Sequence, residues 1–142
     1  MARKDLFISD LLEDLGNIKT AKNKKDFLLS WECRELKTYF KGAFDKSIEF
    51  NIPEITRTYT SKPNSEEGWG AVSREFRYFS KGGDGDNLTE SQILDKFISV
   101  LERVSPEEAK AILLMTDKKL VGKYKGVTKK LISDSFPGLI VK

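Results

Sequence analysis

The chain has 142 residues, 39% of them hydrophobic and 33% charged, which suits one small, highly charged domain. It contains no histidine and a single cysteine, Cys33, which excludes His-dependent catalytic triads, His-based zinc sites, intrachain disulfides and CxxC motifs. The net charge of +3 does not by itself predict nucleic-acid binding, and no segment approaches the ~20 apolar residues that span a bilayer. We therefore expect a cytoplasmic protein with no membrane association, no cofactor and no metal, in which Cys33 is a small buried hydrophobe.

The first third of the chain predicts three helices. Apolar residues from Ile8 to Leu15 recur at helical spacing, and Gly16 is a plausible stop. Thr20 is placed to cap a second helix, and a third is expected from about Cys33 to Phe44.

The middle of the chain is less regular. Residues 47–52 alternate like a strand, but Pro53 follows, so we expect extended chain packed on helices. Residues 53–67 hold little apolar content and predict a long surface loop, either functional or variable. A helix is expected to begin near Trp69 and to end at the glycines of residues 81–87. Its inward-facing residues should be Trp69, Val72, Phe76 and Phe79.

The second half carries clearer helix signals. Thr89 and Gln92 form a capping box, and Ser105 with Pro106 begins the next helix, in which Glu108 should reach back toward the cap. A last helix is expected from Lys129 to Phe136. The whole pattern, residues 1–142, predicts a single compact all-α domain of about seven helices.

The basic residues are unevenly distributed. Residues 117–142 contain seven lysines and two aspartates, and residues 22–41 contain six basic and three acidic residues. The run from Lys123 to Lys130 places Gly126 and Thr128 just before a helix. Gly126 would let a phosphate approach the backbone, and Thr128 would either cap the helix or donate to a phosphate oxygen. Such a turn predicts salt-sensitive binding that is independent of base sequence.

The same C-terminal run resembles the end of the N-terminal DNA-binding domain of phage-type ATP-dependent DNA ligases. The matching residues are the turn from Gly126 to Thr128 and the sequence from Phe136 to Ile140. Residues 11–16, the Lys-rich residues 22–29 and the helix at 35–44 are similar too. The resemblance covers nearly the whole chain. It implies a helical domain that grips duplex DNA through its minor-groove backbone, encircled in the ligases by catalytic domains.

More closely still, the chain resembles an uncharacterised family of small stand-alone proteins of T-even-like tailed phages. The landmarks include residues 35–37, 41–45, 52–54, 81–83, 117–120 and 124–128 together with 136–140. Ligase chemistry is not expected, because residues 81–85 do not match the Lys-x-Asp-Gly nucleotidyl-acceptor motif and no further ligase motif follows. The resemblance to the small phage proteins implies a phage origin and carries no established activity, and we expect a protein that is not an enzyme.

Three other groups of residues resemble functional sites, but a purely structural role explains each of them better. Asp84 and Asp86 alternate as calcium ligands do, but the loop lacks the remaining ligands and a turn between helices is favoured. The aromatic residues from Trp69 to Phe79 could stack bases, although their helical spacing favours core. Glu66 and Glu67 could dock a partner, with a solvated surface as the plainer reading.

Two hypotheses follow. The first is a non-enzymatic phage protein that holds double-stranded or nicked DNA through its sugar–phosphate backbone, without sequence specificity. The alternative is an adaptor or regulator that binds a host or phage replication or transcription protein through the 53–67 loop and its acidic tip. The predicted DNA contacts are Lys123, Lys125, Gly126, Val127, Thr128, Lys129 and Lys130, with a second strip of Lys22, Lys24, Lys25, Arg34 and Lys37.

Overall fold

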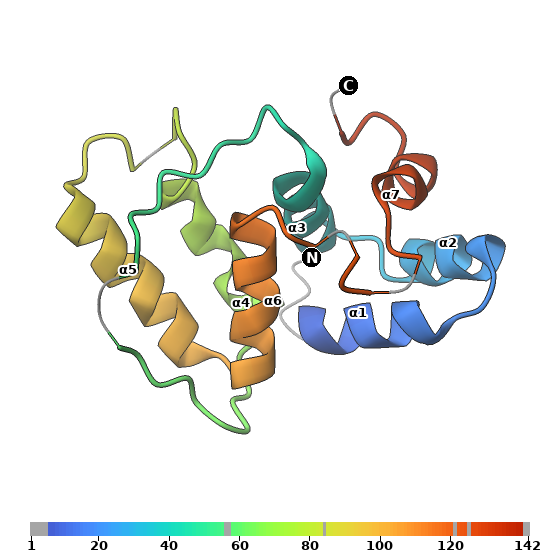
Figure 1. Cartoon of the computed structure of the whole chain (residues 1–142), viewed down its shortest axis with the longest axis horizontal. Helices are drawn as coiled ribbons and strands as arrows, with labels where there is room; N and C mark the ends of the chain where they lie inside the picture. The colour runs from blue at the N-terminus through green and yellow to red at the C-terminus, as the bar shows by residue number, and fades with distance from the viewer. Residues whose placement is uncertain (1–5, 56–57, 84, 121, 125, 141–142) are drawn as a thin grey trace.

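The computed structural model describes residues 6–55, 58–83, 85–120, 122–124 and 126–140. Within these residues it contains seven α-helices and one 3-10 helix and no strand, so the prediction of a single all-α domain is confirmed (Figure 1). The elements are α1 (Ile8–Asn17), α2 (Ala21–Ser30), α3 (Arg34–Phe44), α4 (Trp69–Val72), η1 (Ser73–Tyr78), α5 (Glu90–Arg103), α6 (Pro106–Thr116) and α7 (Lys129–Ser135).

The helix ends follow the local capping signals closely. Thr20 accepts a hydrogen bond from the Asn23 amide at 3.2 Å, and Thr89 and Gln92 form the complete capping box at the start of α5. Ser105 caps α6 with Pro106 in its first turn. Cys33 holds the N-cap position of α3 and is only partly buried, so its prediction as a buried hydrophobe is wrong.

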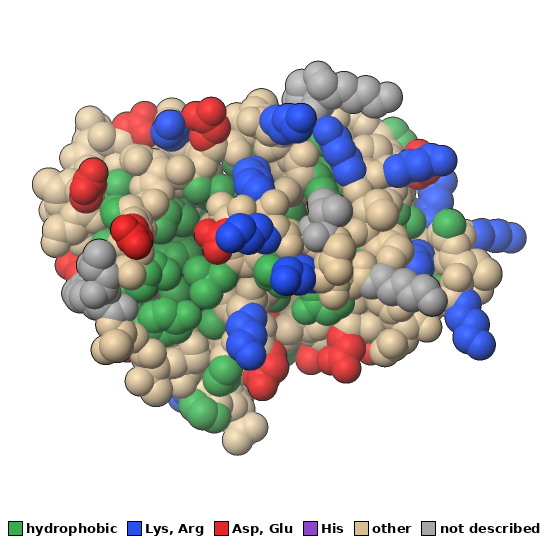
Figure 2. Space-filling view, in the orientation of Figure 1, with side chains coloured by type: hydrophobic (Ala, Val, Ile, Leu, Met, Phe, Trp, Pro, Cys, Tyr) green, Lys and Arg blue, Asp and Glu red, His purple; other side chains and the backbone are tan. Residues whose placement is uncertain are grey.

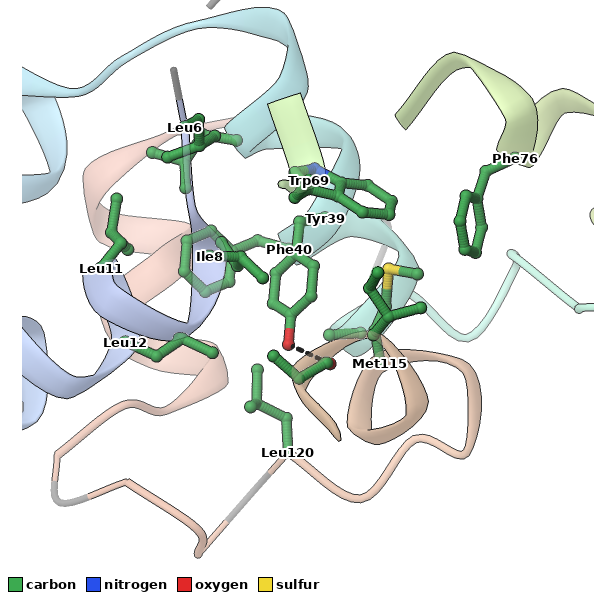
Figure 3. Close-up of a cluster of buried hydrophobic side chains, with 14 of the residues drawn as sticks. Leu6, Ile8, Leu11, Leu12, Tyr39, Phe40, Trp69, Phe76, Met115 and Leu120 are labelled. Atoms are coloured by element: carbon green, nitrogen blue, oxygen red, sulfur yellow. Dashed lines mark hydrogen bonds between the residues drawn. The ribbon is translucent and has the colours of Figure 1, made fainter. Parts of the chain in front are cut away.

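The core lies where α3 crosses α6 and meets α4 and η1 (Figure 3). Tyr39 and Trp69 are fully buried and pack edge to face, with ring centroids 5.5 Å apart. The Tyr39 hydroxyl donates to the Ala111 carbonyl at 2.7 Å, which joins α3 to α6. Burial raises the pKa of Tyr39 well above its ordinary value of 10.0, because the interior disfavours the phenolate. The Tyr39 hydroxyl therefore keeps its proton at physiological pH, and its hydrogen bond to Ala111 is maintained.

The helix expected near Trp69 exists, but only its first turn is α-helical. Residues from Ser73 continue as the 3-10 helix η1. Trp69, Val72, Phe76 and Phe79 are all buried, as predicted. The rings of Trp69, Phe76 and Phe79 form edge-to-face contacts with one another or with Phe97 of α5, so these three rings offer no exposed platform for stacking bases.

Ser47 lies in a turn, so the expected extended chain does not span all of residues 47–52. Residues 48–52 form no helix, and Phe50 forms an isolated antiparallel bridge with Ser80. The described part of residues 53–67 forms no helix or strand and runs across the surface beside α5 (Figure 1).

The expected role of Glu108 is wrong. Its side chain is fully buried and does not reach back toward its own cap. One carboxylate oxygen accepts from the amides of Ile8 and Trp69, and the other from the amide of Ser9, each at 2.7 Å. These amides belong to the first turns of α1 and α4, whose donors have no partner within the helix. Glu108 thus caps two other helices from the start of α6.

Candidate nucleic-acid interface

The turn before α7 has the geometry that its glycine predicts. Gly126 has φ +73°, in the left-handed region that favours glycine. Thr128 accepts a hydrogen bond from the Leu131 amide at 3.1 Å and is the N-cap of α7. Of the two roles predicted for Thr128, the structure shows the cap. Val127 is buried, and its amide donates to the Tyr124 carbonyl at 3.2 Å, so the prediction that Val127 contacts DNA is wrong.

Lys24 is also not the surface contact that the sequence predicts. Its side chain is only 5% exposed, and its ammonium donates to the carbonyls of Leu15 at 2.6 Å and Ile18 at 2.5 Å. A Cβ at Gly126 would lie 2.7 Å from Cε of Lys24. The lysine stem therefore fills the space on the side of Gly126 where a Cβ would stand, while Gly126 itself remains exposed.

The two basic runs nevertheless meet on the surface, because α7 packs against α2. Between them lies an open groove of about 830 Å³, which we call the lysine groove. Its exposed cations are Lys19, Lys22, Lys25 and Lys130, and Asp134 is its one acidic lining residue. Figure 2 shows Lys and Arg side chains gathered over the half of the molecule that holds α2 and α7.

The remaining predicted contacts lie elsewhere. Lys129 lines a neighbouring hollow beside the end of α3, while Arg34 lines a separate cavity between α3 and η1. Lys37 forms an ion pair with Glu32 at 2.7 Å. Lys123 is exposed but outside the lysine groove, and Lys125 lies outside the described residues. The predicted second strip is therefore divided between surfaces.

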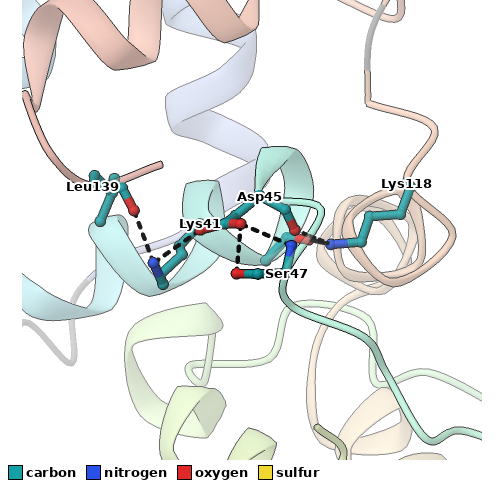
Figure 4. A network of polar contacts seen from close by, with 6 residues as sticks. Lys41, Asp45, Ser47, Lys118 and Leu139 are labelled. Atoms are coloured by element: carbon teal, nitrogen blue, oxygen red, sulfur yellow. Dashed lines mark hydrogen bonds and ion pairs between the residues drawn. The ribbon is translucent and has the colours of Figure 1, made fainter. Parts of the chain in front are cut away.

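A cluster of polar contacts at the end of α3 also uses two lysines (Figure 4). Lys41 donates to the Asp45 carboxylate and to the Leu139 carbonyl, both at 2.9 Å. Lys118 donates to the carbonyls of Gly42 and Asp45. Partial burial lowers the pKa of Lys118, against the opposing effect of Asp45. The sequence gives no signal for this cluster, since its members lie up to 98 residues apart.

The 53–67 loop is fastened to the end of α5. Ser61 and Ser65 donate through their hydroxyls to the carbonyls of Leu101 at 2.9 Å and Arg103 at 2.5 Å. The Lys62 amide donates to the Val104 carbonyl at 2.9 Å, and Arg103 donates to the Glu67 carboxylate at 2.9 Å. The loop thus supplies partners for carbonyls that a helix end leaves unpaired. Of the predicted acidic tip, Glu66 is exposed and Glu67 is engaged with Arg103.

The described residues show neither a metal-binding cluster nor a membrane-spanning helix. No group of three or more His, Cys, Asp or Glu side chains among them could hold a metal ion. Among the same residues no helix is long and apolar enough to cross a membrane.

Comparison with known proteins places the chain in one family. A family model matches residues 11–122, which include most of α1 and all of α2 to α6, and the family is described as one of unknown function. A search of curated proteins gave no match.

Proposed function

This chain belongs to the DUF6433 family of unknown function, and we propose from its surface that it is a non-enzymatic DNA-binding protein. It holds duplex or nicked DNA through the sugar–phosphate backbone. The observation that carries the proposal is the lysine groove, where α2 and α7 bring together basic runs that are about a hundred residues apart.

The chemistry of the groove supports phosphate binding without base readout. Lys19, Lys22, Lys25 and Lys130 are exposed and face a single carboxylate, Asp134. A lysine ammonium attracts phosphate as a point charge and lacks the planar fork with which arginine reads guanine. Such contacts fix a duplex by its charge and carry little sequence information.

Sequence resemblance supports the rest of the proposal. The likeness to the ligase DNA-binding domain favours a module that binds DNA and leaves catalysis to other domains. The likeness to small phage proteins favours a phage origin and action in the host cytoplasm. The absence of histidine from the sequence agrees with a role without acid–base catalysis.

The test is a fluorescence-anisotropy titration with intact and nicked duplexes at two salt concentrations. If four lysines each neutralise one phosphate, the affinity should fall on the order of 100-fold between about 50 and 200 mM salt. Two duplexes of unrelated sequence should bind equally well.

Two matched double variants distinguish the effect of charge in the lysine groove from the effect of the net charge of the protein. Lys22→Glu/Lys130→Glu should abolish most of the binding, because both side chains lie in the groove. Lys62→Glu/Lys110→Glu changes the net charge equally at exposed positions outside it and should bind nearly as wild type. No binding at low salt, or equal losses in both variants, would sink the proposal. A nuclease-resistant complex with a protein, found together with no DNA binding, would favour the adaptor hypothesis.

A further inference from the structure

A second cavity lies between α3 and η1 and shares no lining residue with the lysine groove. Its volume is about 520 Å³, within the range of pockets that hold small organic ligands. Its lining combines an aromatic wall with a rim of cations and includes one carboxylate, that of the buried Glu35.

The wall is aromatic and closely packed. Phe50 and Phe76 meet edge to face with centroids 6.4 Å apart, and Trp69 and Met115 lie behind them in the core. Gly42 permits this arrangement, because a Cβ there would come within 3.0 Å of both Met115 and Phe50. The Trp69 indole N–H donates to the Glu35 carbonyl at 2.7 Å, so the polar atom of this ring is already satisfied. The wall therefore offers apolar contact.

The rim carries three arginines. Arg34 is the first residue of α3, while Arg74 and Arg77 stand three residues apart on η1. Residues three apart eclipse one another in a 3-10 helix, so both side chains leave η1 on the same side. Arg77 donates to the Tyr78 hydroxyl at 2.7 Å. Arg34 and Arg74 are exposed, and neither takes part in the ion pairs formed among the described residues.

We propose that this cavity binds a nucleotide, with the base against the Phe50 wall and the phosphate between Arg34 and Arg74. Guanidinium groups pair with phosphate through two parallel hydrogen bonds, and a flat base gains most from contact with aromatic rings. The hydroxyls of Thr38, Ser73 and Ser80 line the same cavity and can bond to the sugar or the base edge. A free mononucleotide and an unpaired nucleotide in a strand present the same chemistry.

The indole N–H of Trp69 is a local reporter of this site. The chain has two tryptophans, so Trp31→Phe leaves Trp69 as the only indole signal in a ¹⁵N-correlation spectrum. Titration with deoxyadenosine monophosphate should shift this signal and the Gly42 amide in a saturable manner. Deoxyadenosine and inorganic phosphate should each bind at least about tenfold more weakly, because each makes only half of the contacts.

A second test removes the positive charges at the rim of the cavity. Arg34→Gln/Arg74→Gln should weaken nucleotide binding by about tenfold or more, since both changes are at exposed positions that the fold does not use. Lys62→Gln/Lys110→Gln removes the same charge outside the cavity and should leave it unchanged. Thermal melting of each variant checks that it is folded.

Further titrations identify the source of the nucleotide and can overturn the proposal. Competition by a single-stranded oligonucleotide assigns the site to an unpaired nucleotide of a strand, and shifts with the mononucleotide alone assign it to a free one. The proposal is wrong if deoxyadenosine monophosphate moves neither signal, or if phosphate alone binds equally well. It is also wrong if a glutamate-rich peptide produces the shifts and the nucleotide does not. Groove variants that lose duplex binding should keep this response, so the two proposals fail separately.

Discussion

At the scale of single residues, lysine has two distinct uses in this protein. Lys24 and Lys118 direct their ammonium groups at backbone carbonyls near the ends of α1 and α3. Such carbonyls lack partners within the helix and carry partial negative charge, which a nearby cation satisfies. Lys22 and Lys130 instead remain exposed beside the groove. The charge available for binding is therefore smaller than the sequence total.

Lys24→Met should lower the free energy of unfolding by about 1–3 kcal/mol, because it leaves the carbonyls of Leu15 and Ile18 without their donor. Urea denaturation measures this loss. Lys25→Met is the matched control, because Lys25 is the next residue and its side chain is exposed. This change should alter the free energy of unfolding by less than about 0.5 kcal/mol.

DNA binding should show the opposite order for these two variants, with Lys25→Met the weaker binder. Wild-type stability in Lys24→Met would contradict the capping role of this lysine.

Residue-scale predictions succeeded where the partner is local in sequence. Thr20, Thr89 and Ser105 each cap an amide three residues away, so a short pattern is enough to identify them. Lys24 could not be separated from Lys25 in this way. Its burial depends on the packing of the turn at Gly126, about a hundred residues later.

At the scale of elements, the 53–67 loop and α5 form one unit. Hydroxyls and an amide of the loop satisfy the last carbonyls of α5, and Glu67 is held by Arg103. A long loop without secondary structure predicts either function or variability. Its described residues show a third role, as the cap of a helix end. Composition alone could not reveal this, because the carbonyls concerned lie about 40 residues away.

Glu67→Gln should reduce stability by about 0.5 kcal/mol at neutral pH, the value typical of a solvent-exposed ion pair. The hydrogen bond from Arg103 lowers the pKa of Glu67 in the folded protein below its ordinary value of 4.5. The pair therefore contributes stability above pH 4.5, and this contribution is lost as the pH falls through the lowered pKa.

Urea denaturation between about pH 3 and pH 7 should show the difference between wild type and Glu67→Gln closing toward the acid end. Glu66→Gln, at the exposed neighbouring position, should show no such closing. A difference that stays constant with pH would mean that the carboxylate charge has no part in fastening the loop.

At the scale of the whole molecule, Glu108 joins three helices. It begins in the first turn of α6 and accepts from the amides that open α1 and α4. A buried carboxylate is stabilised only when its oxygens receive hydrogen bonds, and here backbone amides supply three of them. The relative placement of these helix ends depends on this one side chain.

Glu108→Gln should destabilise the protein by about 2–3 kcal/mol, because an amide group turns donors toward the waiting N–H groups and leaves at least one unsatisfied. Glu107→Gln changes the exposed neighbour and should be nearly neutral. Thermal and urea unfolding of both variants provide the comparison. Equal stability of the two variants would show that Glu108 is not needed at this junction.

The all-α fold class could be predicted from the sequence, but the way in which the helices pack on one another could not. Helical periodicity and capping residues were enough to predict an all-α domain. The packing of α7 on α2, which creates the lysine groove, accompanies the burial of Leu28 in α2 and Leu131 in α7, and both look like ordinary core residues in the sequence. Tertiary packing also separates Arg34 from Lys22, because Arg34 of α3 and Lys22 of α2 line different hollows.

The carboxylate of Glu108 also has a consequence for the order in which the protein is made. It lies 100 residues after Ile8, whose amide it receives. At about 5–20 residues per second, Glu108 is synthesised some 5–20 seconds after Ile8. During that interval the amides of Ile8 and Ser9 lack their carboxylate acceptor, and the apolar residues of α1 have no α6 to pack against. The native start of the first helix therefore cannot be completed until the last third of the chain has been made.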